Sequence, residues 1–245
     1  MNTKAISVDV VVPVYNEESC LQKNVIILFD YLNKIHDFSW KIIIADNVST
    51  DRTAEIAKEL SLRYDKILYN HIPVKGRGYA LRETFLQSNA DIVCYMDVDL
   101  STNLRYFKLL IEGVRCGYDA SIGSRLMRGS RIKRRLIREI FSRIYNFLVK
   151  VLFLTKFSDA QCGFKAFKTN VAKQLLPFVK NNSWFFDTEL LLLAEYNKYR
   201  IFEVPVEWIE DFKTKVKIPR TILEDLAGLL RMRFTIHKKI IHRMR

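Results

Sequence analysis

The chain has 245 residues, and a hydrophobic content of 49% is sufficient for one large packed domain or two small ones. Its 40 Lys and Arg exceed its 27 Asp and Glu by 13, which favours an anionic partner: nucleic acid, an anionic membrane face or a phosphorylated substrate. The N-terminal sequence lacks a signal-peptide pattern, and no window has the roughly 18 uncharged apolar residues of a spanning helix. Its four cysteines lack metal-like spacing. We therefore expect a cytoplasmic, reducing location.

The first hundred residues alternate between strand and helix patterns. Apolar, β-branched runs predict strands over 8–15, 40–46, 66–72 and 90–99. Apolar residues at helical spacing predict helices over 17–35, 50–64 and 78–88. Continuous apolar strands separated by amphipathic helices are typical of a parallel sheet that is covered on both faces. The sequence therefore predicts an α/β fold with a Rossmann-like, mostly parallel sheet flanked by helices.

The second half is less regular. A fifth strand is expected over 119–125, and a long helix over about 133–154. A turn and strand are expected over 159–167, a further helix over 184–196 and a late strand over 201–208. The last fifteen residues contain six Lys or Arg and no acid, which predicts a basic amphipathic C-terminal segment.

Polar side chains cluster at the predicted strand ends. Ligands of parallel sheets bind beyond the carboxyl ends of the strands, so we expect 13–17, 46–49, 75–78 and 97–101 to line one crevice. Asp97 and Asp99 in "YMDVDLS" are two residues apart, and in a strand they would point to the same side. Because buried carboxylates are costly without a positive partner, they favour a site for Mg²⁺ or Mn²⁺ and a diphosphate. The alternative is a pair of exposed acids in a turn.

Two other strand ends carry weaker signals. Asp46 and Asn47 suit the base or ribose of a nucleotide, although Asp and Asn are also common in turns. In "VKGRGYAL", Lys75 and Arg77 precede a predicted helix whose amides could hold a phosphate. This segment is not a dinucleotide fingerprint, because Leu81 stands where GxGxxG has its third glycine.

The long predicted helix is strongly basic and strongly apolar. Nine Lys or Arg and a single acid, Glu139, occur between Arg125 and Lys150. The expected apolar face consists of Ile137, Ile140, Phe141, Ile144, Tyr145, Leu148, Val151 and Leu152. A polar stripe of Arg138, Ser142 and Asn146 lies beside it. Contact with an anionic membrane, core packing with a solvated charged face, and nucleic-acid binding all fit this pattern. The apolar and aromatic content favours the membrane over nucleic acid.

Taken together, these motifs resemble a known family. "VVPVYNEE", "IIIADNVSTDRT", "KGRGYALR" and "YMDVDLS", in this order, resemble family 2 glycosyltransferases of the GT-A fold. "GSR", "DAQCGFKAF", "WFFDTELL" and "VPVEW" narrow the resemblance to the dolichyl-phosphate and polyprenyl-phosphate hexosyltransferases, which make dolichyl-phosphate glucose or mannose. The resemblance extends from about Val8 to Lys217. It implies a GT-A domain over 1–217 that includes an interface helix at about 133–154, followed by the basic segment 218–245.

The resemblance also implies roles for individual residues on the donor side. Pro13, Tyr15 and Glu17 would flank the nucleotide, and Asp46 would contact its base. Arg77 would lie near the diphosphate. The resemblance makes Asp97 and Asp99 the residues that hold Mg²⁺ or Mn²⁺, and puts Ser101 where some relatives carry a Gln ligand.

On the acceptor side, the resemblance implies that Arg125, Arg138 and Ser142 bind the lipid phosphate. Lys215 would match the lysine of a late Ser-Lys segment. Asp187 and Glu189 fall where other GT-A enzymes keep a catalytic acid, although acids at a helix start also favour the helix dipole.

The sequence departs from the family pattern at two places. The usual Asp-Asp-Gly-Ser is Asp46-Asn47-Val48-Ser49 here, which leaves the base contacts open. Many relatives also carry C-terminal spanning helices, where this chain has a basic amphipathic segment.

The resulting functional hypothesis is an inverting, metal-dependent transferase. It would move a hexose from a nucleotide sugar to a polyprenyl or dolichyl phosphate at the cytoplasmic membrane face, with peripheral membrane contact and no nucleic acid. UDP-glucose is the first candidate donor and GDP-mannose the next, because the run 161–165 resembles the glucosyl branch. A soluble glycan or protein acceptor is the alternative, followed by a non-catalytic membrane-binding module. A membrane-protein partner or a second copy of the chain stays open.

Overall fold

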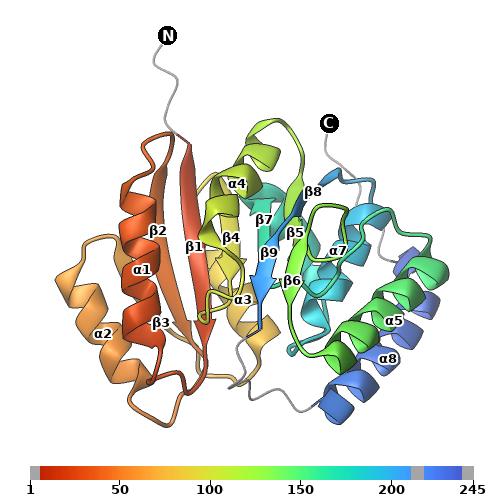
Figure 1. Cartoon of the computed structure of the whole chain (residues 1–245), viewed down its shortest axis with the longest axis horizontal. Helices are drawn as coiled ribbons and strands as arrows, with labels where there is room; N and C mark the ends of the chain where they lie inside the picture. The colour runs from red at the N-terminus through yellow and green to blue at the C-terminus, as the bar shows by residue number, and fades with distance from the viewer. Residues whose placement is uncertain (1–5, 211–217, 239–245) are drawn as a thin grey trace.

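A seven-stranded mixed sheet forms the centre of the computed structural model, which describes residues 6–210 and 218–238 (Figure 1). The strands are ordered β3-β2-β1-β4-β7-β5-β8. Their bounds are β1 Ser7–Val14, β2 Ser39–Asp46, β3 Ile67–His71, β4 Ile92–Met96, β5 Ala120–Ser124, β7 Phe164–Lys168 and β8 Ile201–Pro205. Strand β7 is antiparallel to both of its neighbours, and the other pairings are parallel. The predicted Rossmann-like, mostly parallel sheet is confirmed.

Helices cover both faces of the sheet. One face packs against α1 (Leu21–Asn33), α2 (Thr53–Arg63) and α4 (Phe107–Arg115). The other packs against α3 (Arg77–Gln87), α6 (Thr169–Leu175) and α7 (Phe186–Tyr196). Short 3₁₀ turns occur at Leu104–Tyr106, Leu176–Phe178 and Ile236–Lys238.

The burial of the strands explains their continuous apolar sequences. Along β1, Val10 and Val12 belong to the core on one side of the sheet, while Val11 belongs to the core on the other side. Because side chains alternate along a strand, a sheet with helices on both faces requires an apolar residue at almost every position.

A small second sheet lies beside the main one. Strand β6 (Arg131–Lys133) pairs in parallel with β9 (Glu207–Ile209), and Thr102 bridges to Trp208. The single strand predicted over 201–208 is therefore wrong in its extent, since the chain leaves the main sheet after Pro205. This second sheet places Trp208 beside Thr102, in the segment that follows β4.

Two predicted elements are too long. The predicted helix over 17–35 begins at Leu21, after a turn. The predicted strand over 90–99 ends at Met96, so Asp97 and Asp99 lie in the following turn, where Leu100 has a positive φ of 52°. The argument that strand alternation points both carboxylates to one side is wrong.

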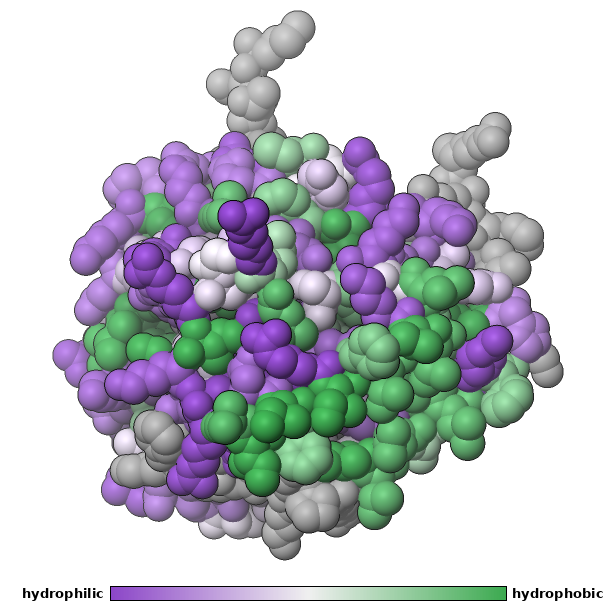
Figure 2. Space-filling model, turned by 45° about the vertical axis from the view of Figure 1, so that its right-hand side comes forward, coloured by the Kyte–Doolittle hydropathy of each residue, from purple (hydrophilic) through white to green (hydrophobic). Residues whose placement is uncertain are grey.

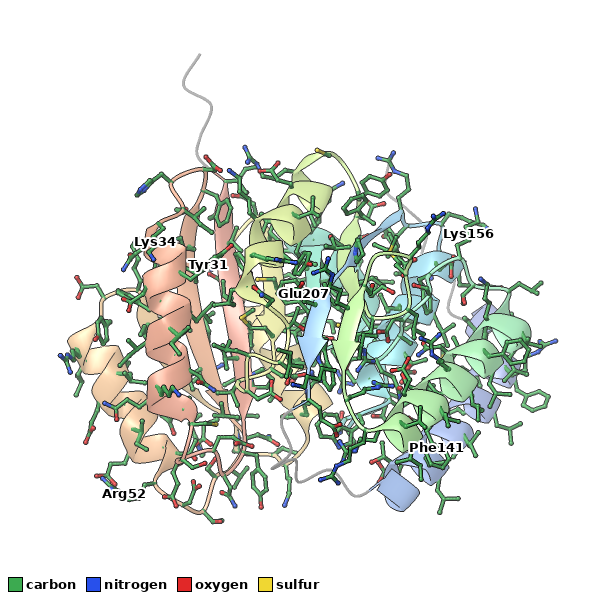
Figure 3. All side chains as sticks on the ribbon, viewed as in Figure 1. Tyr31, Lys34, Arg52, Phe141, Lys156 and Glu207 are labelled. Atoms are coloured by element: carbon green, nitrogen blue, oxygen red, sulfur yellow. The ribbon has the colours of Figure 1, made fainter. Side chains whose placement is uncertain are left out.

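Helix α5 (Leu136–Phe153) lies beside α8 (Ile218–Thr235) at one end of the molecule (Figure 1). Six side chains of the predicted apolar face point to solvent, with exposed fractions between 40% and 61%: Ile137, Ile140, Phe141, Ile144, Val151 and Leu152. Phe141 is labelled on α5 in Figure 3. The inward side carries Ser142, Tyr145, Asn146 and Val149. The interpretation in which the apolar face packs in the core is wrong, because the polar stripe is turned inward instead.

Helix α8 packs into the core that also contains the inward residues of α5, Tyr145 and Val149. Leu229 and Met232 are fully buried there, and a Cβ on Gly228 would lie 2.5 Å from ring carbons of Phe185. The domain boundary at 217/218 stays a prediction, and Lys215 lies outside the described residues. None of the helices in the described part of the chain has both the length and the apolar composition needed to cross a bilayer.

Candidate active site

The segment after β3 connects three of the predicted crevice segments. Asn47, directly after β2, accepts a hydrogen bond from the backbone N–H of Gly76 (2.6 Å) and donates to the carbonyl of Val74 (2.6 Å). Gly76 has a φ of 144°, and a Cβ there would lie 2.2 Å from the carbonyl oxygen of Asn182. Only glycine fits this position. From the sequence, Asn47 could either contact the base of a nucleotide or stabilise a turn. In the structure it holds the loop that carries Lys75 and leads into Arg77.

The nucleotide side of the crevice contains Asp46. This carboxylate is buried and accepts hydrogen bonds from the backbone of Ser49 (3.1 Å) and the hydroxyl of Tyr69 (3.2 Å). Burial and the charge of Asp46 raise the pKa of Tyr69 to about 12. Since the hydroxyl of Tyr69 stays protonated, it remains a donor that fixes the orientation of Asp46.

Lys75 and Tyr15 form the rim of this side. The ammonium of Lys75 donates to the hydroxyl of Tyr15 (2.9 Å) and lies 4.2 Å from the centre of its ring. Pro13 pairs with Ala45 in the register of β1 and β2. Glu17 lies in the turn between β1 and α1, and its carboxylate accepts from the thiol of Cys20 (3.5 Å).

Arg77 connects two carboxylates that are distant in sequence. Its Nη2 donates to Oδ1 of Asp97 and its Nη1 to Oδ2 of Asp187, each at 2.8 Å. The guanidinium lies 5.2 Å from the ring centres of both Tyr95 and Trp184. A planar cation between two aromatic rings and two carboxylates is held in a single orientation. Arg77 is therefore a fixed positive charge at the end of β4.

A buried polar cluster lies beneath Arg77. Asp187 accepts from the hydroxyl of Tyr95, and the ammonium of Lys165 is 3.7 Å from its Oδ1. Burial opposes ionisation of Asp187, but Lys165 and Arg77 lower its pKa below the ordinary value. Burial and the charge of Asp187 raise the pKa of Tyr95 well above its ordinary value. Asp187 is thus a carboxylate that stays ionised. It is buried behind Arg77, which lies between it and Asp97 at the crevice.

Glu189 has a different role. It lies with Asp187 in the first turn of α7, but its carboxylate forms two 2.8 Å bonds to Arg231 of α8 and also accepts from the backbone of Asn181. Glu189 is fully buried in this ion pair. Its position favours a structural attachment of α8 over a chemical role.

The turn after β4 brings Asp97, Asp99 and Ser101 together. Oδ1 of Asp99 accepts from the backbone N–H of Ser101 (2.9 Å). The hydroxyl of Ser101 is buried and has no hydrogen-bond partner within 6–210 and 218–238. Gly163 leaves room for the carboxylate of Asp97, because a Cβ there would lie 1.9 Å from its Oδ2. Oxygen ligands in a turn at a sheet edge suit a hard divalent cation.

Protein groups alone do not complete such a metal shell. Within 6–210 and 218–238, no three His, Cys, Asp or Glu side chains converge as a metal-binding group. Mg²⁺ and Mn²⁺ are commonly held by one or two carboxylates together with phosphate oxygens and water. Asp97, Asp99 and the buried hydroxyl of Ser101 therefore fit a cation that is shared with a diphosphate.

A second cationic centre lies at the end of β5. Arg125 binds Asp159 through Nε (2.7 Å) and Nη2 (2.9 Å), and its backbone N–H donates to the same carboxylate (3.0 Å). Burial opposes ionisation of both groups. The mutual attraction nevertheless lowers the pKa of Asp159 to about 2 and, with a contribution from Asp97, raises the pKa of Arg125. The guanidinium also lies 5.5 Å from the ring centre of Trp208.

Two other residues predicted to bind the acceptor phosphate, Arg138 and Ser142, lie on α5. Arg138 pairs with the buried Glu210 (3.0 Å), and Arg134 joins Arg125 beside Trp208 at 5.8 Å. Ser142 is on the inward side of α5, and its buried hydroxyl has no hydrogen-bond partner in the part of the chain that the structure describes. The acidic partners Asp159 and Glu210 were not predicted, since nothing in their local sequence indicates which arginine each one meets.

The fold is that of the GT-A glycosyltransferases. Glucosyl-3-phosphoglycerate synthase from Mycobacterium tuberculosis, solved in complex with Mn²⁺, UDP and glucosyl-3-phosphoglycerate, superposes with a TM-score of 0.67 at 19% identity. The match covers 92% of this chain and 79% of that one. At this level of identity the likeness concerns the fold.

The sequence comparison defines the family. The Glycosyl transferase family 2 model matches residues 9–176, and the chain belongs to this family of transferases. Glycosyltransferase AglD from Haloferax volcanii is 36% identical over 98% of this chain and 39% of its own length. Dolichyl-phosphate beta-glucosyltransferase ALG5D from Trichomonas vaginalis is 32% identical over 87% of this chain and 69% of its own length. The chain thus spans about two fifths of the archaeal relative.

Proposed function

We propose that the protein transfers a hexose from a nucleotide sugar to a polyprenyl phosphate, with UDP-glucose as the first candidate donor and GDP-mannose as the next. The observation that carries this proposal is the pairing of two centres, the acidic turn Asp97–Asp99 and Arg125. One short loop joins them, because Asp159 binds Arg125 and the carbonyl of Gly163 accepts from the backbone N–H of Asp97. An acidic turn suits a metal-bound diphosphate, and a rigid arginine suits an anionic acceptor. Relatives named dolichyl-phosphate beta-glucosyltransferase support the choice of acceptor and sugar.

The donor would bind along the ends of β1, β2 and β4. Pro13, Tyr15 and Glu17 would flank the nucleotide, and Asp46 would accept from its base. Lys75, which contacts Tyr15, and Arg77, which contacts Asp97, would supply positive charge beside the diphosphate. Asp97, Asp99 and Ser101 would hold Mg²⁺ or Mn²⁺, which when bound supplies positive charge to the departing diphosphate.

The acceptor phosphate would bind on the opposite side, at Arg125 and Arg138, with Ser142 behind them and Lys215 as a further expected cation. A phosphate monoester is already anionic at neutral pH, so one of its oxygens can attack the anomeric carbon without a strong base. The bond from that carbon to the diphosphate oxygen breaks as the new bond forms, and the nucleoside diphosphate leaves with the electron pair. Attack from the opposite side inverts the anomeric centre. The residues act through positioning and charge stabilisation, with Asp187 orienting Arg77.

The lipid acceptor requires access to a bilayer, and the outer side of the helix pair supports this. Figure 2 shows hydrophobic side chains gathered in a broad area over the part of the molecule that carries α5. The area continues on α8 with Leu223, Leu226, Leu230 and Phe234, which are 44–69% exposed. Arg131, Lys133 and Lys150 are exposed near both ends of α5. Apolar side chains flanked by basic ones suit the cytoplasmic surface of an anionic membrane.

A soluble glycan or protein acceptor is the alternative, and product analysis separates the two. Purified protein is incubated with Mn²⁺, radiolabelled UDP-glucose or GDP-mannose, and a short polyprenyl phosphate. We expect label in the organic phase with one of these donors. Label that appears only on added soluble glycan or protein supports the alternative, and absence of lipid label with every donor overturns the proposal.

A further inference from the structure

The loop of residues 159–163, between α5 and β7, holds both charged centres of the site in place. Asp159 binds Arg125 through three hydrogen bonds. At the other end of the loop, the carbonyl of Gly163 accepts from the backbone N–H of Asp97 (3.3 Å), and the missing Cβ of Gly163 makes room for the Asp97 carboxylate. A shift of this loop would therefore move the acceptor and donor sides of the crevice relative to each other.

Two buried polar side chains attach this loop to the helix pair. From α5, Oδ1 of Asn146 accepts from the backbone N–H of Ala160 (2.8 Å). From α8, Oδ2 of Asp225 accepts from Nε2 of Gln161 (3.0 Å). Asn146 is 6% exposed and Asp225 is 4% exposed, although both helices expose apolar side chains on their outer sides. The side chains of Asn146 and Asp225 are thus directed at the loop.

Burying the carboxyl group of Asp225 costs free energy, because the group loses its hydration. Burial raises its pKa to about 7, against the ordinary value of 3.8. An apolar residue of similar volume would avoid the loss of hydration. Within 6–210 and 218–238, the side chain of Asp225 is hydrogen-bonded to Gln161, in the loop that orients Arg125. This buried acid therefore serves the position of the loop rather than the stability of the fold.

We infer that Asn146 and Asp225 are positioning residues, through which α5 and α8 hold the 159–163 loop so that Arg125 is aimed at the acceptor. This inference rests on the proposed function for the identity of the acceptor. The two helices then have two roles: their outer sides face the bilayer, and their inner polar side chains set the geometry of the phosphate site.

The chain offers a matched control for each helix. Tyr145, next to Asn146 on α5, shares a 2.7 Å hydrogen bond with Thr188 of α7. Arg231 attaches α8 to Glu189 of α7. Both contacts fasten the same helices to the body of the protein without involving the loop. Tyr145→Phe and Arg231→Gln therefore report what a loss of helix attachment does by itself.

The kinetic test compares Asn146→Ala and Asp225→Ala with these controls in lipid-phosphate transfer by the full chain. We expect the loop variants to raise the KM for polyprenyl phosphate by about 5- to 30-fold while the donor KM changes less than about twofold. Asp225→Asn keeps an oxygen for Gln161 and should retain the wild-type acceptor KM. Equal changes in both KM values, or the same acceptor effect in Tyr145→Phe and Arg231→Gln, would overturn the inference.

A second measurement does not depend on activity. In hydrogen exchange without substrates, amides of residues 161–164 should exchange faster in both loop variants than in wild type and in the two controls. Unchanged exchange in the loop variants overturns the inference whether or not the protein transfers sugar. Wild-type protein that transfers no sugar to the lipid, but shows the expected exchange pattern, overturns the proposed function and leaves the loop attachment supported.

Discussion

Arg77 binds Asp187 at 2.8 Å although 110 residues separate them in sequence. The same guanidinium binds Asp97, the first carboxylate of the acidic turn. Asp187 is almost fully buried, whereas Asp97 is partly exposed at the crevice. Because Arg77 is bound to the buried Asp187, it fixes the position of Asp97 in the turn that we propose holds the metal and diphosphate.

Replacing Arg77 tests this connection. Arg77→Lys keeps the charge but lacks the planar fork that reaches both carboxylates, so we expect kcat/KM to fall by about 100-fold or more. Arg77→Ala should also lower the free energy of unfolding by about 3–5 kcal/mol, because Asp187 loses a partner in a buried setting. Steady-state kinetics and urea unfolding measure these effects. Arg52→Lys, in an exposed ion pair with Glu55, is the control, and wild-type kinetics in Arg77→Lys would contradict the prediction.

Asp99 tests the metal site. Asp99→Asn removes a charged oxygen ligand, and we expect transfer to fall by about 100-fold or more while the melting temperature changes little. Titration of Mn²⁺ followed by electron paramagnetic resonance should show weaker binding. Asp91→Asn makes the same chemical change just before β4, where Asp91 bonds to Ser7, and should leave Mn²⁺ binding unchanged. Equal Mn²⁺ affinity in wild type and Asp99→Asn would refute the metal role.

Gly163 tests the close approach of the loop to Asp97. Gly163→Ala places a Cβ where the structure has an Asp97 oxygen at 1.9 Å, so we expect a loss of about 1–3 kcal/mol in unfolding free energy and of most activity. In an Asp97→Ala background the carboxylate is absent, and the same substitution should cost less. Urea unfolding of the four proteins gives the coupling between the two sites. Additive costs would show that the clash is not with Asp97.

Asp225 predicts a pH dependence of stability. Its pKa is raised from 3.8 to about 7 in the folded protein, mainly by burial, while Gln161 lowers it and the charges of Glu224 and Asp187 raise it. The folded state binds this proton more tightly than the unfolded state, so stability falls as pH rises from about 4 to 7. Asp225→Asn should therefore raise the unfolding free energy at pH 8 by on the order of 2–4 kcal/mol, and much less at pH 4. A gain of equal size at both pH values would exclude this titration as the cause.

The outer side of α5 predicts membrane binding. The pair Phe141→Asp and Ile144→Asp places two charges on the exposed apolar area, and we expect affinity for vesicles containing phosphatidylglycerol to fall by about tenfold or more, measured by co-sedimentation. Because both residues are about half exposed, the melting temperature should stay near wild type. Leu62→Asp changes an 88% exposed leucine on α2 and serves as the control. Unchanged vesicle binding, with a shift from dimer to monomer in solution, would assign the surface to a second copy of the chain.

Local sequence was sufficient for the sheet and for the location of the crevice. The apolar runs that become β1, β2 and β4 are buried on both faces of the sheet. Each run can therefore be predicted as a strand from its own residues, without information about the neighbouring strands. Parallel strands end on the same side, and this rule brings Asp46, Lys75 and Asp97 to one edge. The order of these motifs along the chain also carried the resemblance to family 2, which the comparison confirms.

The tertiary structure alone decided the partners and the orientation of α5. Arg77 meets Asp187 because α3 and α7 pack on the same face of the sheet. Arg125 meets Asp159 because β7 inserts antiparallel between β4 and β5, directly after the loop that carries Asp159. Periodicity left open whether the apolar side of α5 packs inward. In the structure Asn146 lies inward, where it accepts a hydrogen bond from the loop, and the apolar side is exposed. Periodicity describes which residues share a face of a helix. Which face meets the protein depends on the groups that the rest of the chain presents to it.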